Sequence, residues 1–147
     1  MEKKPIATIK LTLLANKAAP SSVLGQTLGQ YKINIMEFCK LFNNQTKNIK
    51  EQVYIPTLIK IYSQNSFKIT TKTPSTTYLL KQTAHVTKGS ALPKKELLGR
   101  DILLKEIYHL AIFKKCDQLM NHLELKSICK ILIATAKSIG LAVRAKS

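Results

Sequence analysis

The side chains that could perform acid, base or metal chemistry are dispersed along this sequence of 147 residues. The histidines His85, His109 and His122 lie far apart and lack the HExxH or Cys/His spacings of zinc sites. No two of the eight acidic residues are spaced to bring a pair of carboxylates together on one helix face. Glycine-rich phosphate loops and nucleophile elbows do not occur. The sequence therefore predicts no catalytic residue, no metal ligand and no cofactor, and a protein that is not an enzyme.

A stretch near the C-terminus is suited to different chemistry, the binding of phosphate groups. Apolar residues over 123–139 recur at helical spacing, which predicts a helix that ends at Gly140. Its polar face combines lysines with small side chains: Ser127, Lys130, Ala134, Lys137 and Ser138. Small residues let a nucleic-acid backbone approach while the lysines hold its phosphates. An ordinary solvated helix face is the alternative interpretation of this helix taken alone.

A basic loop is expected in the same half of the chain, over residues 86–99. The runs Lys88-Gly89-Ser90 and Lys94-Lys95 bring positive charge and exposed backbone amides to it. Because the loop and the helix are both basic and belong to one small module, RNA or DNA binding is favoured over a merely solvated surface.

The composition is strongly basic, with 24 Lys+Arg against 8 Asp+Glu and a net charge of +16. Such a charge attracts polyanions, either nucleic acid or an acidic membrane face. With 45% hydrophobic residues the chain is not a disordered basic tail. No apolar run approaches the roughly 18 residues of a membrane span, so an integral membrane protein is not expected. A membrane is not among the expected partners. Only Arg100 and Arg144 are arginines, which favours recognition of backbone and shape over base edges, although the codon usage of an AT-rich genome would also enrich lysine.

The three cysteines indicate a reducing compartment. Cys39, Cys116 and Cys129 leave one thiol unpaired in any disulfide scheme and include no CxxC pair. Cys39 lies on the apolar face of an expected helix, so we expect it to be a buried thiol and not a nucleophile.

Hydrophobic periodicity predicts a small α/β domain in the first half. Asn34 is placed to cap a helix, and the Thr8, Lys10 and Thr12 side chains alternate with apolar ones as in a half-buried strand. Pro56 cannot donate to a sheet, which points to an edge strand or a bulge. The expected elements are a strand over 6–14, a loop with at most a short helix over 15–32, a helix over 35–46, and hairpin strands over 53–62 and 66–71.

The periodicity changes from 2 to 3.6 at the middle of the chain, which predicts a helical second domain. Thr73-Pro74 is typical of a helix opening, with Thr as the cap and Pro at the first helical position. Three helices are expected, over about 75–85, 101–115 and 123–139. The predicted fold class is therefore α+β with two small domains: an N-terminal α/β domain over 1–71 with a three-stranded sheet, a linker over 72–74, and a three-helix RNA-binding domain over 75–147.

Several runs of the sequence together resemble the family of large-subunit ribosomal protein eleven, a component of the ribosomal GTPase-associated centre. The resemblance covers nearly the whole chain in order. It is most specific in NIMEFCK at 34–40 and TKTP at 71–74. Further matches are Gly25, 28–30, 42–43, Thr46, 66–67, 79–81, 89–90, Pro93, 135–138 and 140–141.

The resemblance implies that the C-terminal domain binds folded large-subunit rRNA of the GTPase-associated centre, largely by shape and backbone. The helix-face residue Lys130 joins the positions that match the family's RNA-facing surface. The expected rRNA-binding residues are Lys81, Lys88, Gly89, Ser90, Pro93, Lys94, Lys130, Ala134, Thr135, Lys137, Ser138 and Gly140. The N-terminal domain is expected to face elongation and release factors and the ribosomal stalk proteins.

The resemblance also implies a loop over 20–30 that borders the factor and thiopeptide-antibiotic cleft. Its expected residues are Pro20, Ser21, Ser22, Gly25, Gln26 and Gln30. The bacterial family usually has a proline-rich stretch after Pro20, and its loss here should leave the loop freer. Two residues differ from those usual in the family, with Ala134 where Gly is common and Lys137 where Arg is usual. The leucine-rich segment 101–115 fits the family poorly, as expected if it packs against a partner specific to this ribosome.

The predicted function is a structural constituent of the large ribosomal subunit that organises this rRNA at the stalk base and supports translation factors. A non-ribosomal RNA-binding regulator that reuses the fold is the alternative. Enrichment in Lys, Asn and Ile suggests an organellar ribosome, in the mitochondrial matrix rather than a plastid, with a bacterial cytoplasm as the remaining alternative. Since Met1 stands where bacterial homologues begin, the chain is expected to be organelle-encoded, or mature with its targeting segment removed or cryptic.

Overall fold

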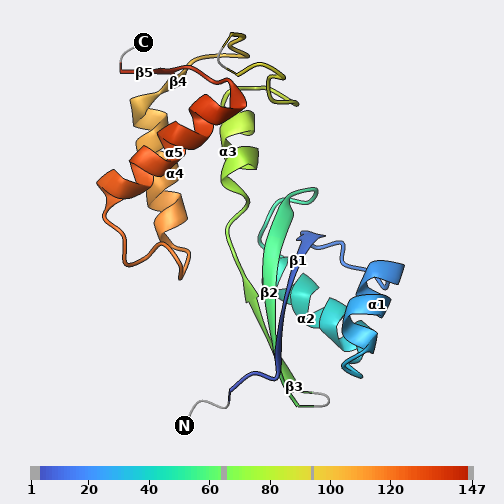
Figure 1. Ribbon diagram of the computed structural model, residues 1–147. Helices are drawn as coiled ribbons and strands as arrows, with labels where there is room; N and C mark the ends of the chain where they lie inside the picture. Colours follow the sequence, from blue (N-terminus) through green and yellow to red (C-terminus); the bar gives the residue numbers. More distant parts are fainter. Residues whose placement is uncertain (1–3, 64–65, 94, 146–147) are drawn as a thin grey trace. The chain divides into compact units, whose positions relative to one another are not determined.

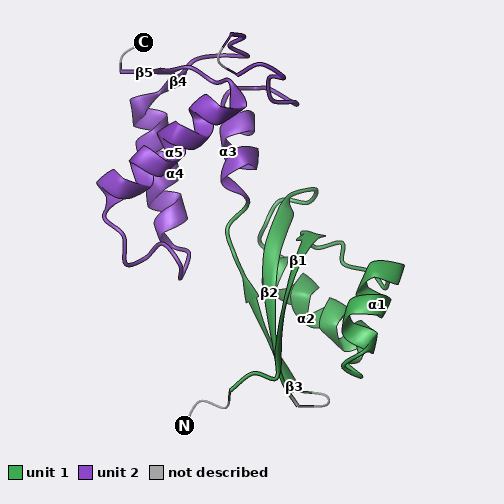
Figure 2. Ribbon diagram, in the orientation of Figure 1, with its two compact units in different colours: residues 1–74 green, residues 75–147 purple. Residues whose placement is uncertain are grey.

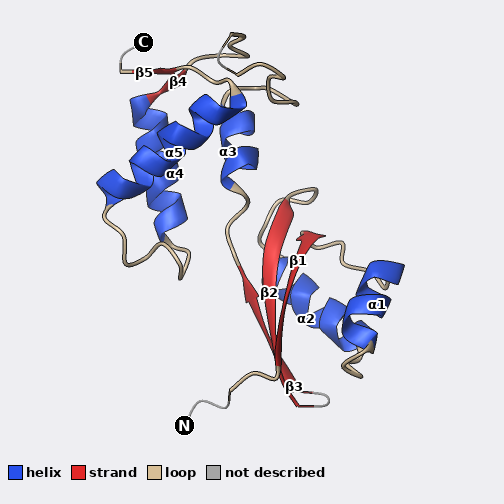
Figure 3. Cartoon of the chain, viewed as in Figure 1, coloured by secondary structure: helices blue, strands red, loops and turns tan. Residues whose placement is uncertain are grey.

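The computed structural model describes residues 4–63, 66–93 and 95–145. The chain divides between Pro74 and Ser75 into two compact units, each with its own hydrophobic core (Figure 2). Among the described residues no helix is both long and apolar enough to cross a membrane. The predicted α+β class is confirmed, since the three-stranded sheet belongs to the first unit and the second is built mainly on three helices (Figure 3).

The first unit is built on a three-stranded antiparallel sheet in the order β1-β2-β3 (Figure 1). Its strands are β1 (Ala7–Leu14), β2 (Tyr54–Ser63) and β3 (Ser66–Thr71), close to the predicted ranges. Alternation turns Ile55, Ile59 and Ile61 of β2 into the core, where each is at most 2% exposed. The side chains between them are left on the opposite face, as the period-2 pattern predicted.

Two helices pack against the buried side of this sheet. Helix α2 (Ile35–Thr46) has the predicted bounds, and Asn34 caps it by accepting a hydrogen bond from the Met36 backbone N–H at 3.0 Å. Phe38 and Phe42, one turn apart on α2, are fully buried with ring centroids 6.3 Å apart. Helix α1 (Ser22–Gly29) precedes it and completes the core.

The prediction that Pro56 marks an edge strand or a bulge is wrong. β2 is the central strand, and Pro56 pairs with Thr12 of β1. Its carbonyl accepts from the Lys72 N–H at 2.9 Å, one position beyond the last β2–β3 pair of Thr57 with Thr71. Since proline has no N–H to return that bond, it is tolerated where the ladder ends. The irregularity in β2 lies at the other end, between Ile61 and Ser63.

The second unit contains the three predicted helices around a core of aliphatic residues. They are α3 (Thr76–Thr83), α4 (Leu104–Lys115) and α5 (Leu125–Ile139). Leu80, Ile107, Ile128 and Leu132 from these helices are at most 1% exposed. α5 ends as predicted at Gly140, which has the left-handed φ of 91°.

Two predicted helix starts are wrong. α3 is capped by Ser75, whose Oγ accepts from the Tyr78 N–H at 3.2 Å, and not by Thr73. The segment expected to start a helix at 101 instead forms β4 (Ile102–Leu103), which pairs in parallel with β5 (Val143–Arg144). Residues 102 and 103 therefore use their backbone in a ladder with the C-terminal segment, and α4 begins after them.

Candidate RNA interface

The outward face of α5 carries the predicted phosphate-binding residues. Because Ile128, Leu132 and Ala136 turn into the core, the side of the helix opposite them is left to solvent. The exposed residues there include all five predicted for this face: Ser127, Lys130, Ala134, Lys137 and Ser138. Ile131, at 42% exposed, also reaches the surface from α5. The helix thus offers a lysine-bearing surface with small residues between the cations.

The loop after α3 is packed onto the C-terminal end of α5. Its Ser90 N–H donates to the Ile139 carbonyl at 2.9 Å, and its Leu98 N–H donates to the Gly140 carbonyl at 2.9 Å. A Cβ added at Gly89 would lie 3.1 Å from Ile139 Cγ2, so the missing side chain permits the close approach. These bonds bring two segments about 45 residues apart in sequence into one surface.

Gly140 is required at this junction for two independent reasons. Its φ of 91° belongs to the left-handed region that side chains disfavour. A Cβ there would also lie 2.7 Å from Ser90 Cβ, 3.1 Å from the Glu96 carbonyl oxygen and 3.4 Å from Pro93 Cα. The predicted site residue Gly140 therefore acts by letting loop and helix meet.

A hollow of about 710 Å³ lies where the loop meets α5. Its lining residues are Leu92, Pro93, Lys95, Lys137 and Ser138. Its lining is largely aliphatic, with Leu92, Pro93 and the side-chain stems of Lys95 and Lys137, a surface suited to ribose and base faces. Leu92 and Lys95 were not among the predicted site residues. The sequence features that could have pointed to them are the position of Leu92 next to Pro93 and of Lys95 next to Lys94.

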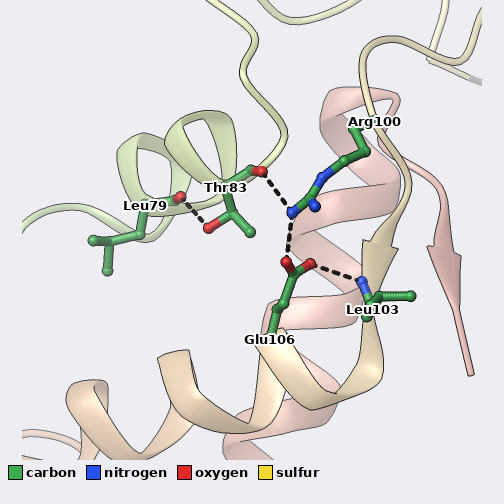
Figure 4. A network of polar contacts seen from close by, with 5 residues as sticks. All are labelled: Leu79, Thr83, Arg100, Leu103 and Glu106. Atoms are coloured by element: carbon green, nitrogen blue, oxygen red, sulfur yellow. Dashed lines mark hydrogen bonds and ion pairs between the residues drawn. The ribbon is translucent and has the colours of Figure 1, made fainter. Parts of the chain in front are cut away.

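A polar network anchors the loop at its two ends (Figure 4). Arg100, after the loop, donates to the Thr83 carbonyl at the end of α3 and pairs with Glu106 on α4. Glu106 Oε2 also accepts from the Leu103 N–H at 3.0 Å, and Thr83 Oγ1 donates to the Leu79 carbonyl at 3.0 Å. The Leu103 N–H, followed by Arg100, holds the pKa of Glu106 below its ordinary value. The loop is therefore fixed between α3 and α4.

The lysines of the surface are not neutralised by the unit's own acids. Within the described residues, Lys88, Lys130 and Lys137 form no ion pair, and all three are exposed. Both arginines are used inside the fold, Arg100 by Glu106 and Arg144 by Asp101. Free charge at the site is thus supplied by lysine, which neutralises phosphate as a point charge and does not read base edges in bidentate fashion.

The remaining predicted residues of this unit lie at different distances from the junction. Thr135 and Ser138 use their hydroxyls within α5, donating to the Ile131 carbonyl at 2.8 Å and the Thr135 carbonyl at 2.7 Å. Lys81 is half-buried on α3, and Lys94 lies outside the described residues. The structure thus brings together Gly89, Ser90, Pro93, Lys137, Ser138 and Gly140, with Lys130 and Ala134 farther along the same helix face.

The segment over 15–32, expected to be a loop with at most a short helix, contains the short capped helix α1. Ser21 Oγ accepts from the Leu24 N–H at 3.3 Å and starts α1, and Leu24 and Leu28 anchor the helix in the core. Only the inference of a freer loop after Pro20 is wrong over Ser22–Gly29, because these two leucines, one turn apart, are buried in the core. The predicted residues of the segment are surface groups, with Pro20, Ser21, Ser22, Gln26 and Gln30 exposed and Gly25 half-buried.

Other reactive groups do not assemble into a site in the described part of the chain. No three His, Cys, Asp or Glu side chains converge there as metal ligands would. Cys39 is a core thiol as predicted, and burial raises its pKa. Lys114 was not foreseen as a buried cation; it is 5% exposed and pairs with Asp117 at 3.4 Å.

Fold and site together define a class of protein: a small two-unit protein with one basic helical unit suited to holding RNA by its backbone. Comparison with known families is consistent with this class. Residues 9–67 match the family model for the N-terminal domain of ribosomal protein L11, and residues 72–143 match that for its RNA binding domain. The chain belongs to the ribosomal protein L11 family.

Two relatives align with nearly the whole chain. The large ribosomal subunit protein uL11m of Reclinomonas americana is 43% identical over 141 residues, which are 94% of each protein. The large ribosomal subunit protein uL11 of Hydrogenobaculum sp. (strain Y04AAS1) is 40% identical over 143 residues, 97% of each. The family resemblance is confirmed, as is the prediction of a structural, RNA-binding ribosomal protein that is not an enzyme.

Proposed function

We propose that the chain binds and organises the rRNA of the GTPase-associated centre at the stalk base of the large ribosomal subunit. Residues 75–147 hold the rRNA and residues 1–71 face elongation and release factors and the stalk proteins, with 72–74 as the linker. The observation that carries the proposal is the junction of the Gly89–Ser90 loop with the end of α5, on a helix face that carries Lys137 and, farther along, Lys130, neither in an ion pair with a described residue.

The charge and geometry of this junction favour a folded RNA over a simple duplex. A hollow beside a helix face of small residues with lysine point charges fits the shape of a folded backbone. Sequence reading in a groove would need free arginines or amides placed for base edges, and both arginines are committed to ion pairs. The proposed rRNA-binding set also includes the predicted residues Lys81, Lys88, Pro93, Ala134 and Thr135, and Lys94 on the ground of the sequence alone.

The test is competition between the cognate rRNA fragment and a duplex RNA of the same length and scrambled sequence. We expect the full chain to prefer the cognate fragment and to co-sediment with large subunits through a high-salt wash. Equal affinity for both RNAs would contradict a specific rRNA site. Specific RNA binding without co-sedimentation would instead favour the alternative function, a non-ribosomal regulator that reuses the fold.

We further propose that the ribosome in question is mitochondrial. The support is the 43% identity to a protein named uL11m, together with the lysine-rich composition. The bacterial relative at 40% identity keeps a bacterial cytoplasm as the alternative, with a plastid behind it. Immunoblotting of purified mitochondrial, plastid and cytosolic fractions separates these locations, and absence from the mitochondrial fraction would overturn the proposal.

A further inference from the structure

Helix α4 carries an exposed line of large apolar side chains that the RNA interface does not use. Leu104, Tyr108 and Ile112 are 42%, 48% and 44% exposed. Their spacing of four residues places them above one another along the helix, and we call this set the α4 stripe. Ile107 and Ala111 form the core side of the same helix and are fully buried; the stripe begins beside that side at Leu104 and turns away from it toward Ile112. The α4 stripe is therefore surplus apolar surface and not a poorly covered part of the core.

The surroundings of the α4 stripe are basic. Lys105 follows along its side and is exposed, and the half-buried Lys115 lies one turn beyond Ile112. The described acids near α4 are already engaged by other cations: Asp101 by Arg144, Glu106 by Arg100 and Asp117 by Lys114. A partner that covers the stripe must therefore bring apolar side chains together with carboxylates.

Two other occupants fit these observations less well. A second copy of the chain would bring another net charge of +16 against a basic surface. RNA is matched by small residues and free lysines on α5. On α4 only Tyr108 could stack on a base, whereas the other two stripe residues, Leu104 and Ile112, neither pair with phosphate nor stack on bases. A contiguous exposed apolar line on a small domain is typical of protein docking.

We propose that the α4 stripe is the docking site of an acidic amphipathic helix from another protein of the large subunit. Its three anchors span about 12 Å along α4, which two turns of a partner helix would match. The partner's apolar residues would cover the stripe, and flanking carboxylates would pair with Lys105 and Lys115. The inference rests on the proposed place of the chain in the ribosome for the source of the partner, but not on the RNA interface.

The first arm of the test places a photo-crosslinking amino acid at position 112 of the full chain and incorporates it into large subunits. Phe113 provides the matched control, because it is 46% exposed but turned about 140° around the helix from the centre of the stripe. We expect crosslinking from position 112 to one protein, through a peptide rich in Asp and Glu with apolar residues at helical spacing, and little from position 113. Crosslinks to RNA, to a second copy, to a basic peptide or to nothing would overturn the proposal.

The second arm decides the inference on the free protein, whatever the outcome of subunit incorporation. A synthetic helical peptide with leucines at i, i+4 and i+8 and flanking glutamates is titrated into the labelled full chain and followed by NMR. We expect amide shifts confined to α4, at least a tenfold loss of affinity in Tyr108→Glu/Ile112→Glu, and unchanged affinity in Phe113→Glu. Equal binding of a scrambled peptide, or shifts on the α5 lysines, would show mere charge attraction and refute the proposal. Failure of the chain to enter large subunits counts against the proposed function alone.

Discussion

Replacing Gly140 by alanine should lower both the stability of the second unit and its affinity for RNA. An alanine held at a φ of 91° costs about 1–2 kcal/mol. Its Cβ would lie 2.7 Å from Ser90 Cβ and 3.1 Å from the Glu96 carbonyl oxygen, so the loop must move, at a further cost of about 1–3 kcal/mol. Together we expect Gly140→Ala to lower the free energy of unfolding of this unit by about 2–5 kcal/mol.

Gly25→Ala is the matched control for this substitution. Gly25 lies within α1, its φ is not positive, and nothing stands within 4 Å of an added Cβ. Alanine is the better helix former there, so stability should be unchanged or raised by up to about 1 kcal/mol. Urea unfolding followed by circular dichroism measures both variants, and titration with the rRNA fragment measures affinity. A Gly140→Ala protein as stable as the parent, with unchanged RNA affinity, would refute the account of the loop–helix junction.

Three further predictions concern individual charged groups. Lys137→Ala should reduce the slope of log affinity for rRNA against log salt by about 0.7–0.9. Lys47 is exposed in the first unit, and the control variant Lys47→Ala should leave this slope unchanged. Asp117→Ala leaves the buried ammonium of Lys114 without its ion pair and should cost about 3–5 kcal/mol in urea unfolding; a cost below 1 kcal/mol would contradict a buried pair. Because the pKa of Glu106 is lowered on folding, its carboxylate stabilises the protein above the ordinary value of 4.5, and this contribution disappears as the pH falls through the folded pKa. Unfolding of Glu106→Gln at several pH values should therefore differ from the parent near neutrality and converge with it in acid, and a difference that persists at low pH would count against this assignment.

Elements with strong periodicity or a clear cap could be predicted from the sequence. α5 has an apolar residue at every turn and a terminal Gly140, and α2 has Asn34 directly before its first turn. For α1 the prediction was a short helix at most, because two glycines and few apolar residues give little helical periodicity. Its two leucines stabilise the helix only when they are buried in the core of the folded unit. Ile102–Leu103 pairs with Val143–Arg144, which lies some 40 residues away in the sequence. Both strands are too short to give a local sequence pattern that would predict this pairing.

The candidate site was predicted as a set of residues but not as a geometry. Family resemblance and the helix pattern pointed to Ser90, Lys137 and Gly140, whereas only the folded chain shows that Gly140 is the contact point between loop and helix. The state of the cations also depends on tertiary structure. The sequence could not show that Arg100 and Arg144 form ion pairs within the second unit while Lys130 and Lys137 on α5 form none with the described residues.

The proposed binding of rRNA by the lysine-bearing face of α5 is tested most directly by the RNA preference of the full chain and of a variant carrying Lys130→Ala and Lys137→Ala. Affinities are measured by filter binding for the cognate GTPase-associated-centre fragment and for a scrambled duplex of equal length at one fixed salt concentration. The account predicts a preference for the cognate RNA on the order of 10³-fold and a clear loss of affinity in the double variant. Equal affinity of the parent for both RNAs, or an unaffected double variant, would contradict it.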